Sequence, residues 1–147
     1  MNLDETDTKI LNHLLVDARQ SSRQLAHKLG ISTVTMISRL RKLEEKKIIQ
    51  GYSVRLDHEI LGYDITAIIE VTTTKGKMLE IEGEIAGNEN VCAVYDITGH
   101  ADTLVIGKFK NRNSLSDFVK KVSAMSNVEN TITHIALNTI KEDFRLL

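Results

Sequence analysis

Residues 21–45, SSRQLAHKLGISTVTMISRLRKLEE, decide how the first third of the chain folds. Ser21 and Gln24 match the S-x-x-Q pattern of a capping box, which opens a short helix. Gly30 supplies the left-handed residue that ends this helix, and Ser32 can cap the next one. Two short helices joined by a glycine-containing turn predict a helix-turn-helix.

The second helix of this pair is expected to have an apolar face and a polar face. Apolar side chains at three-residue spacing should pack on the other helices, namely Val34, Ile37, Leu40 and Leu43. The remaining face carries Thr33, Thr35, Met36, Ser38, Arg39, Arg41 and Lys42. Short hydroxyl side chains allow close approach to base edges, a guanidinium can pair with guanine, and an ammonium can neutralise phosphate. This face therefore predicts contact with DNA, whereas a plain three-helix bundle would simply present a solvated polar surface.

Upstream and downstream segments extend the same unit. Another helix is predicted over residues 4–17, because its apolar side chains form one stripe, Ile10, Leu11, Leu14 and Leu15. Asp4 or Asp7 can cap the start of this helix. Residues 48–52 are expected to form a short β-wing behind the outer helix. The unit is thus predicted to be a winged helix-turn-helix over residues 1–52.

The charges are distributed unevenly along a chain whose net charge is only -1. Residues 19–47 hold eight basic and two acidic side chains, whereas residues 63–147 hold nine basic and twelve acidic ones. A local cationic patch on a nearly neutral protein is typical of a surface that binds a polyanion. The alternative is a solvated helix face without a ligand.

Composition excludes several classes of protein. Among 147 residues, 41% are apolar and 27% charged, as in ordinary globular domains and unlike disordered or collagen-like chains. The single cysteine, Cys92, cannot form an intrachain disulfide, and the acidic N-terminus lacks the features of a secretory signal. No apolar stretch is long enough for a transmembrane helix. We expect a cytoplasmic protein.

The second half of the chain changes to the period of β-strands after a linker over 53–64. Alternation predicts strands near 65–72, 91–97, 104–109 and 130–140. Amphipathic helices are expected over 77–86 and from Asn113 or Ser114 onward. The order βαββαβ is that of a ferredoxin-like unit, here over 65–147, so the fold class is α+β.

Apolar side chains occur at both the odd-numbered and the even-numbered positions of the predicted strands, so both faces of the sheet carry them. Two helices on one face cannot cover all of Ile68, Val94, Leu104, Ile106, Ile135 and Leu137. The open face would leave an apolar patch, which typically marks an interface. We therefore predict a homodimer joined through its sheets, whose paired outer helices suit a pseudo-palindromic site in double-stranded DNA.

The chain also resembles a known family, Lrp/AsnC, the feast/famine transcriptional regulators of bacteria and archaea. The resemblance rests on Leu3-Asp4, Ile10-Leu11, Ala18-Arg19, Gln24-Leu25-Ala26, Leu29-Gly30-Ile31-Ser32 and the run ISTVTMISRLRKLEEKKIIQGY over 31–52, and it extends over the βαββαβ half. It implies a small-molecule effector, most simply an amino acid, and further assembly of dimers, typically to an octamer. Two positions depart from the family: Lys47 stands where glycine is usual, and His58 where proline is frequent. The helix end and the linker are therefore expected to differ.

The turn after the second predicted strand resembles the family's G-x-x-D effector loop, although such a pattern taken alone more often marks an ordinary hairpin turn. The resemblance implies that two segments form the effector site, with residues Thr98, Gly99, Ala101, Asp102, Thr131 and Thr133. His100 could either line the site or face water.

For DNA, we predict that Ser22 and Arg23 hold phosphate and that the following helix contributes Ser32, Thr33, Thr35, Met36, Ser38, Arg39 and Lys42. No catalytic motif or metal-ligand spacing is present, so we expect neither an enzyme nor a cofactor or metal. The predicted function is a sequence-specific, amino-acid-responsive DNA-binding transcriptional regulator. Two alternatives remain: a sensor that acts through a protein partner, and an architectural DNA binder without an effector. The effector, the operator and the direction of regulation do not follow from the sequence.

Overall fold

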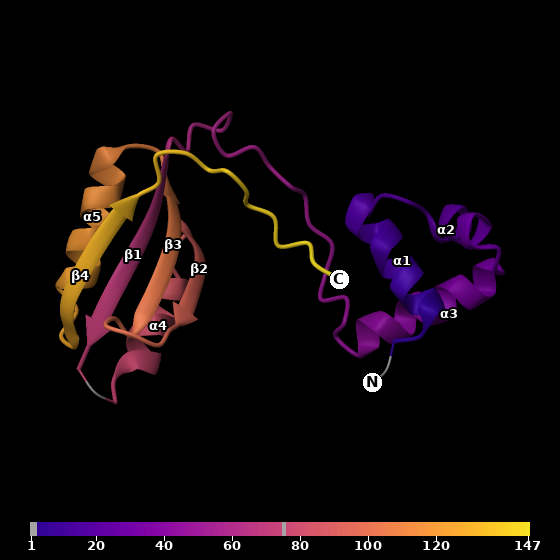
Figure 1. The fold of residues 1–147 in the computed structure, drawn as a ribbon, viewed down its shortest axis with the longest axis horizontal. Helices are drawn as coiled ribbons and strands as arrows, with labels where there is room; N and C mark the ends of the chain where they lie inside the picture. The colour runs from indigo at the N-terminus through magenta and orange to yellow at the C-terminus, as the bar shows by residue number, and fades with distance from the viewer. Residues whose placement is uncertain (1–2, 75) are drawn as a thin grey trace. The chain divides into compact units, whose positions relative to one another are not determined.

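The computed structural model describes residues 3–74 and 76–147, and these divide into two compact units (Figure 1). One unit is helical, runs to Arg55 and also includes Glu142–Leu147. The other, Leu56–Lys141, contains the sheet.

Three helices make up the first unit: α1 (Glu5–Val16), α2 (Ser22–Leu29) and α3 (Thr33–Glu45). Their starts are capped as expected: the side chains of Asp4, Ser21 and Ser32 each accept a hydrogen bond from a backbone N–H of the first turn. Gly30 ends α2 in the left-handed conformation, with φ +65°. The helix-turn-helix prediction is confirmed.

The rotation of α3 about its own axis differs from the prediction. Met36 and Leu43 are buried, and Leu40 packs beside them, in a core that includes Ile10 of α1 and Leu25 of α2. Val34 and Ile37, expected in this core, are 79% and 47% exposed. The stripe i, i+4, i+7 from Met36 therefore replaces the stripe that starts at Val34, because a long unbranched thioether fills the space between the helices.

The C-terminal end of α3 adopts the geometry that glycine usually provides. Lys47 has φ +58° and is the one non-glycine residue with positive φ in the described chain. Hydrogen bonds close this end from the backbone N–H groups of Lys47 to Glu44 O (2.9 Å) and of Ile48 to Leu43 O (2.9 Å). The expectation of a differently built helix end is thus wrong, and the lysine adopts the strained conformation itself.

No strand forms over residues 48–52, so the predicted β-wing is absent from this segment. Instead, the Tyr52 hydroxyl donates a hydrogen bond of 3.0 Å to Glu44, which ties the segment back to α3.

The linker contains a turn. Asp57 accepts a hydrogen bond from the backbone N–H of Ile60 (3.1 Å) within this turn, which includes Gly62 at φ +82°. The linker after His58 is therefore a hydrogen-bonded turn.

The second unit has the predicted βαββαβ order. Its elements are β1 (Ile65–Thr73), α4 (Met78–Ala86), β2 (Val91–Asp96), β3 (Thr103–Phe109), α5 (Arg112–Ser123) and β4 (Val128–Ile135). The sheet order is β2-β3-β1-β4 and all neighbours are antiparallel. Two boundaries differ from the prediction: Asn111 caps α5 two or three residues earlier than expected, and β4 ends at Ile135.

Both helices cover one face of the sheet (Figure 1). On β1, residues 67, 69, 71 and 73 are buried on this side. They pack with Val105 and Phe109 of β3, with Ile81 and Ile85 of α4, and with Phe118 of α5. This alternation leaves the even-numbered residues of β1 on the other face.

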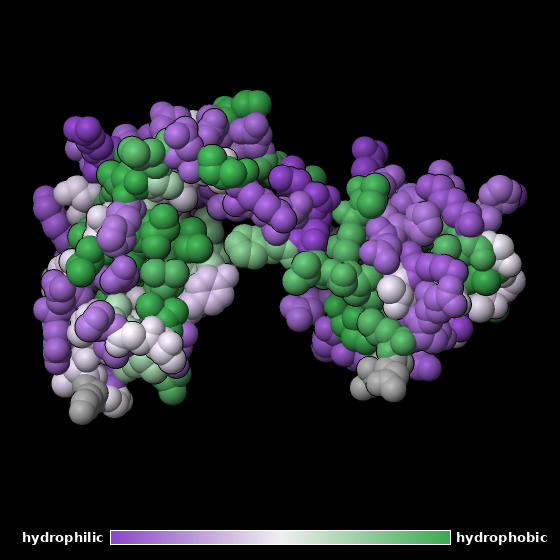
Figure 2. Space-filling model, viewed as in Figure 1, coloured by the Kyte–Doolittle hydropathy of each residue, from purple (hydrophilic) through white to green (hydrophobic). Residues whose placement is uncertain are grey.

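Among the described residues of this unit, no helix covers that other face, and its centre is largely apolar. Pairing places Ile68 beside Ile106, and Leu104 beside Tyr95, while Ile132 continues the patch on β4. Figure 2 shows apolar side chains gathered over the strands. Of the residues expected here, Val94 instead packs on the helix-covered core, and Ile135 shares the parity of Ala67 on that side.

The strained helix end predicts a stabilising substitution. Lys47→Gly should raise the free energy of unfolding by about 1 kcal/mol, because glycine adopts positive φ without a Cβ clash. Urea unfolding followed by circular dichroism measures this change. The matched control is Lys46→Gly, since Lys46 has φ -83° and should lose stability on gaining glycine. A loss of stability in Lys47→Gly would contradict the interpretation.

Candidate nucleic-acid interface and effector loop

The outward surface of α3 combines small hydroxyl side chains with cations. Thr33, Thr35 and Ser38 are exposed, and so are Arg41 and Lys42. Thr35 and Ser38 also line a hollow of about 560 Å³, together with Lys42 and Lys46 and with Asp4, Asp7, Val34 and Arg39. This surface offers hydrogen-bond donors and positive charge together, which is what the edges and phosphates of a duplex require.

Two predicted DNA contacts have structural roles of their own. The Ser32 hydroxyl caps α3, accepting from Thr35 N at 3.0 Å and lying 2.8 Å from the Thr35 hydroxyl. Met36 was predicted to face DNA but is completely buried, so it cannot contact a duplex while the unit is folded. This correction follows from the same rotation of α3 that exposes Val34.

Arg39 is engaged by two carboxylates at the start of α1. One guanidinium nitrogen, Nη1, lies 2.6 Å from Asp4 Oδ2 and 2.7 Å from Asp7 Oδ1. The backbone N–H of Asp7 and the Arg39 guanidinium both lower the pKa of Asp4 below its ordinary 3.8. Hydrogen bonds to Asp4 and Asp7 also raise the pKa of Arg39. Arg39 thus fastens α3 to α1 in this structure, rather than presenting a free guanidinium to bases as predicted.

The start of α2 provides a second cationic position. Arg23 is exposed in the first turn, and Ser22 beside it is partly buried. The first turn of a helix presents free backbone N–H groups, which favour phosphate. The structure places Ser22 and Arg23 at the start of α2, and their contact with phosphate stays a prediction.

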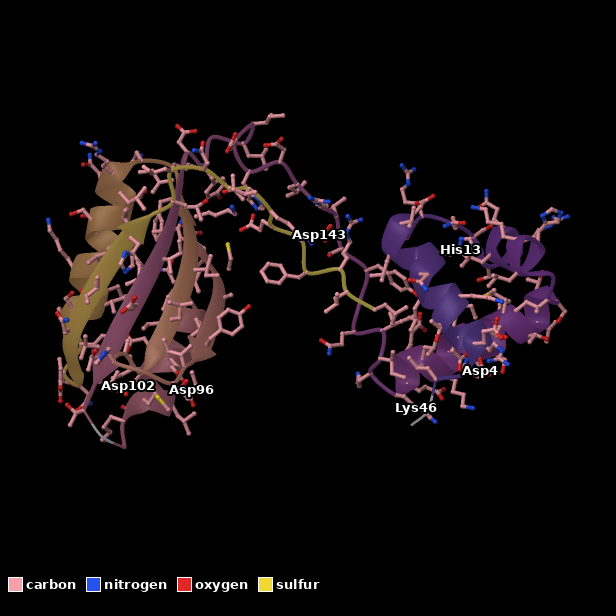
Figure 3. All side chains as sticks on the ribbon, viewed as in Figure 1. Asp4, His13, Lys46, Asp96, Asp102 and Asp143 are labelled. Carbon is pink, nitrogen blue, oxygen red and sulfur yellow. The ribbon has the colours of Figure 1, made fainter. Side chains whose placement is uncertain are left out.

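The C-terminal segment contacts the helical unit, which the sequence did not indicate. Arg145 Nη1 donates to Leu15 O at 3.0 Å, near the end of α1. Asp143 pairs with Arg145 at 2.7 Å and lies 3.7 Å from Arg55. The hydrogen bonds from Arg145 strongly lower the pKa of Asp143, which Figure 3 labels. Nothing in hydropathy periodicity marks such a polar return of the chain.

The predicted effector loop is fastened to the end of β1. Asp102 Oδ2 accepts from the backbone N–H of Thr73 at 2.7 Å and lies 3.3 Å from the Thr73 hydroxyl. The backbone N–H of Asp102 donates to Val71 O at 3.1 Å. Gly99 has φ +129°, and Figure 3 shows Asp96 and Asp102 at the same end of the sheet. The Asp102 carboxylate therefore holds the loop in shape, in addition to any contact with a ligand.

The two predicted effector threonines, Thr131 and Thr133, lie on β4, the strand that pairs with β1. Thr131 pairs with Val71, the residue that receives the Asp102 hydrogen bond, and Thr133 pairs with Ile69. The Thr131 and Ser123 hydroxyls are 3.0 Å apart. Asp102 and Thr131 thus both lie beside Val71, on the two sides of β1, whereas Thr133 lies beside the middle of that strand. Within the loop, Ala101 is buried, whereas Thr98, Gly99 and His100 are exposed.

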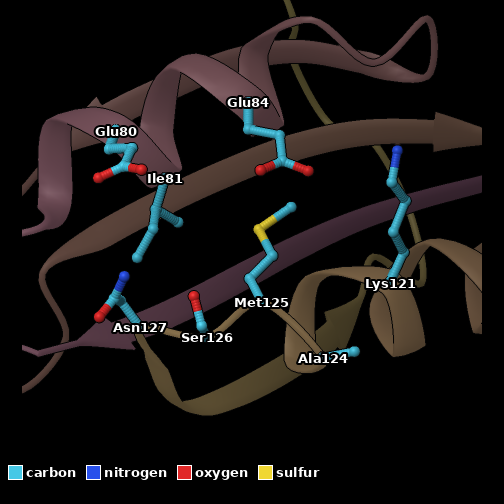
Figure 4. A pocket seen from close by; sticks show the side chains of 8 residues that line it. All are labelled: Glu80, Ile81, Glu84, Lys121, Ala124, Met125, Ser126 and Asn127. Carbon is cyan, nitrogen blue, oxygen red and sulfur yellow. The ribbon is translucent and has the colours of Figure 1, made fainter.

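A separate hollow of about 290 Å³ lies between α4 and α5. Figure 4 shows Glu84 on one wall, and Lys121 and Met125 on the other. None of the six predicted effector residues lines it.

Among the described residues, no group of three or more acidic, histidine or cysteine side chains is arranged to hold a metal ion. In the same part of the chain, no helix has the length and apolar character to cross a bilayer.

Comparison with family models matches both halves of the chain. Residues 3–44 match the AsnC-type helix-turn-helix domain, and residues 66–146 match the Lrp/AsnC ligand binding domain.

Relatives and solved structures agree with this match. An uncharacterised HTH-type transcriptional regulator of Pyrococcus furiosus is 46% identical, covering 99% of each chain. The HTH-type transcriptional regulator FL11 of Pyrococcus horikoshii is 34% identical, covering 98% of this chain and 95% of its own. A transcriptional regulator of Neisseria meningitidis, solved as a complex with L-Met, is 26% identical with a TM-score of 0.91, covering 99% of this chain and 97% of its own.

Proposed function

Because the chain belongs to the Lrp/AsnC family of transcriptional regulators, we propose that it recognises specific sites in double-stranded DNA and that an amino acid modulates this binding. The family supplies a helix-turn-helix DNA-binding domain joined to a ligand-binding domain. The observation that carries the DNA part is the exposed surface of α3, where Thr33, Ser38 and Lys42 stand on a cationic helix.

Affinity and specificity come from different groups on this surface. Lys42 and Arg41, together with Arg23 of α2, neutralise phosphates and provide most of the affinity. The hydroxyls of Thr33, Thr35 and Ser38 are short enough to approach base edges closely. Arg39 acts indirectly, since its pairs with Asp4 and Asp7 hold α3 against α1.

The effector part of the proposal places an amino acid at the loop containing Gly99 and Asp102, with Thr131 and Thr133 on the adjoining strand. Support comes from the loop's exposed backbone at Thr98 and Gly99, which can receive a carboxylate, and from the acidic Asp102, which can receive an ammonium. The Neisseria meningitidis regulator is a structural neighbour solved in complex with L-Met. A ligand changes DNA affinity only if it favours one state of assembly or spacing over another.

Two copies are proposed to pair through the uncovered sheet face. Its central apolar residues, among them Ile68, Ile106 and Leu104, are not covered by either helix described in the sheet unit. Pairing would remove this patch from water and would also supply two α3 helices for a pseudo-palindromic site. Larger assemblies, up to an octamer, would build on this dimer.

Salt dependence tests the DNA contact. We expect the logarithm of the binding constant for a duplex to fall linearly with the logarithm of salt concentration, because phosphate binding releases counterions. Lys42→Met should reduce the slope by about 1, the value for one lost phosphate contact. Fluorescence anisotropy measures both, and Lys120→Met on α5 is the control. Absence of duplex binding at low salt would favour a protein partner, and equal affinity for all sequences would favour an architectural role.

Sedimentation equilibrium tests the dimer. The chain should have a mass near twice its 16.5 kDa, or a multiple of that dimer. Ile68→Glu should yield monomers, because it places a charge in the centre of the pairing face. Leu79→Glu is the matched control, since Leu79 is 81% exposed on α4. Monomeric wild-type protein would refute sheet pairing.

A thermal-shift panel of the twenty amino acids tests the effector site. A ligand at 100 times its Kd adds about 2.7 kcal/mol, which corresponds to a rise in Tm of roughly 5–10 °C for a chain of this size. Asp102→Asn should abolish the shift, because the amide keeps an oxygen for Thr73 but loses the charge that receives an ammonium. Asp117→Asn on α5 should keep it. No shift with any amino acid would contradict the assignment.

A further inference from the structure

Two branched apolar side chains project from the part of α3 that carries the DNA-binding surface. Val34 is 79% exposed and Ile37 is 47% exposed, although both belong to a helix with a well-formed buried face. They stand three residues apart and therefore lie on the same side of the helix. Arg41 follows Ile37 by four residues and continues the same exposed row.

The core of the helical unit does not use either side chain. Its buried members from α3 are Met36 and Leu43, with Leu40 partly buried beside them. A single exposed apolar residue is ordinary on a protein surface. Val34 and Ile37 instead form a small apolar patch on one row of the helix. Polar and cationic side chains surround this patch, among them Ser38 and Arg41.

The position of this patch in the fold restricts what can cover it. Val34 and Ile37 lie in the first half of α3, and the N-terminal residues of the second helix of a helix-turn-helix are those that reach base edges in the major groove. The C5-methyl of thymine is the apolar group that a base pair presents there. Valine and isoleucine cannot form hydrogen bonds with bases, so a methyl group is their complementary partner in that groove.

We propose that Val34 and Ile37 contact thymine methyl groups and thereby give this protein a preference for A·T pairs at the positions that they face. The proposal rests on the DNA recognition proposed above and specifies its chemistry. Arg41, on the same row, then lies over the neighbouring phosphates or a guanine. Specificity would arise in part from apolar contact, in addition to the hydroxyls of Thr35 and Ser38.

Replacing thymine by deoxyuridine tests this directly, because deoxyuridine lacks only the methyl group and keeps every hydrogen-bonding group. Duplexes would first be selected from a random library with the wild-type protein, and each thymine of the recovered sequence would then be replaced singly. We expect replacement at one or two positions of each half-site to raise Kd about fourfold, the change that corresponds to burying one methyl-sized group.

Variants of the two side chains identify the contacts. In Val34→Ala or Ile37→Ala, deoxyuridine at the corresponding position should no longer raise Kd. The protein substitution and the base replacement remove the same contact, so their effects on the binding free energy are not additive. Val34→Thr replaces one methyl by a hydroxyl and keeps the other, so it should retain only part of the deoxyuridine effect. The matched control is Val16→Ala: Val16 is 83% exposed on α1 and should leave the deoxyuridine effect intact.

Each result decides between the possibilities. If the wild-type protein binds its selected duplex but no deoxyuridine replacement raises Kd, the methyl contacts are refuted while DNA recognition stands. The methyl contacts are equally refuted if the thymine effect persists unchanged in the alanine variants. If no duplex is recovered at all, both proposals are overturned. Thermal unfolding of each variant confirms that it is folded, which the exposure of Val34 leads us to expect.

Discussion

The burial of Met36 and Leu43 between the helices sets the rotation of α3 about its axis, and the proposed DNA-binding surface depends on that rotation. With these side chains packed against Ile10 and Leu25, the opposite side of the helix must face outward. Rotating α3 enough to bury Val34 would remove Met36 from the core and leave a cavity, which costs about 2–5 kcal/mol for a side chain of this size. Packing in the interior therefore selects which residues are available to DNA.

Charged groups secure the same arrangement from the surface. Arg39 lies at the border of the buried stripe, where its guanidinium meets Asp4 and Asp7. Asp4 additionally caps α1, so a single carboxylate both starts one helix and holds the next. An arginine paired in this way fixes the position of α3 against α1. The sheet unit has a similar arrangement at Asp102, whose carboxylate accepts a hydrogen bond from Thr73 and fixes the loop to the end of β1.

Local sequence signals predicted much of the fold because they report short-range interactions. The box formed by Ser21 and Gln24, the cap at Ser32 and the left-handed Gly30 each involve residues within a few positions of one another. The alternation along β1 likewise records which side faces the helices. The segment after α3 could not be predicted in this way: it satisfies the wing pattern, yet Tyr52 bonds to Glu44 and no strand forms there.

The sequence by itself determined the helix-turn-helix, the βαββαβ order, the cationic character of the first unit and the family, because these follow from periodicity, caps and motif spacing. Only the tertiary structure decided which face of α3 is outward, that Arg39 is engaged by carboxylates, and that Arg145 returns to α1. Those outcomes depend on side-chain volume and on partners up to 130 positions away. A sequence pattern contains neither quantity, so local rules alone do not decide whether Val34 or Met36 is the buried residue.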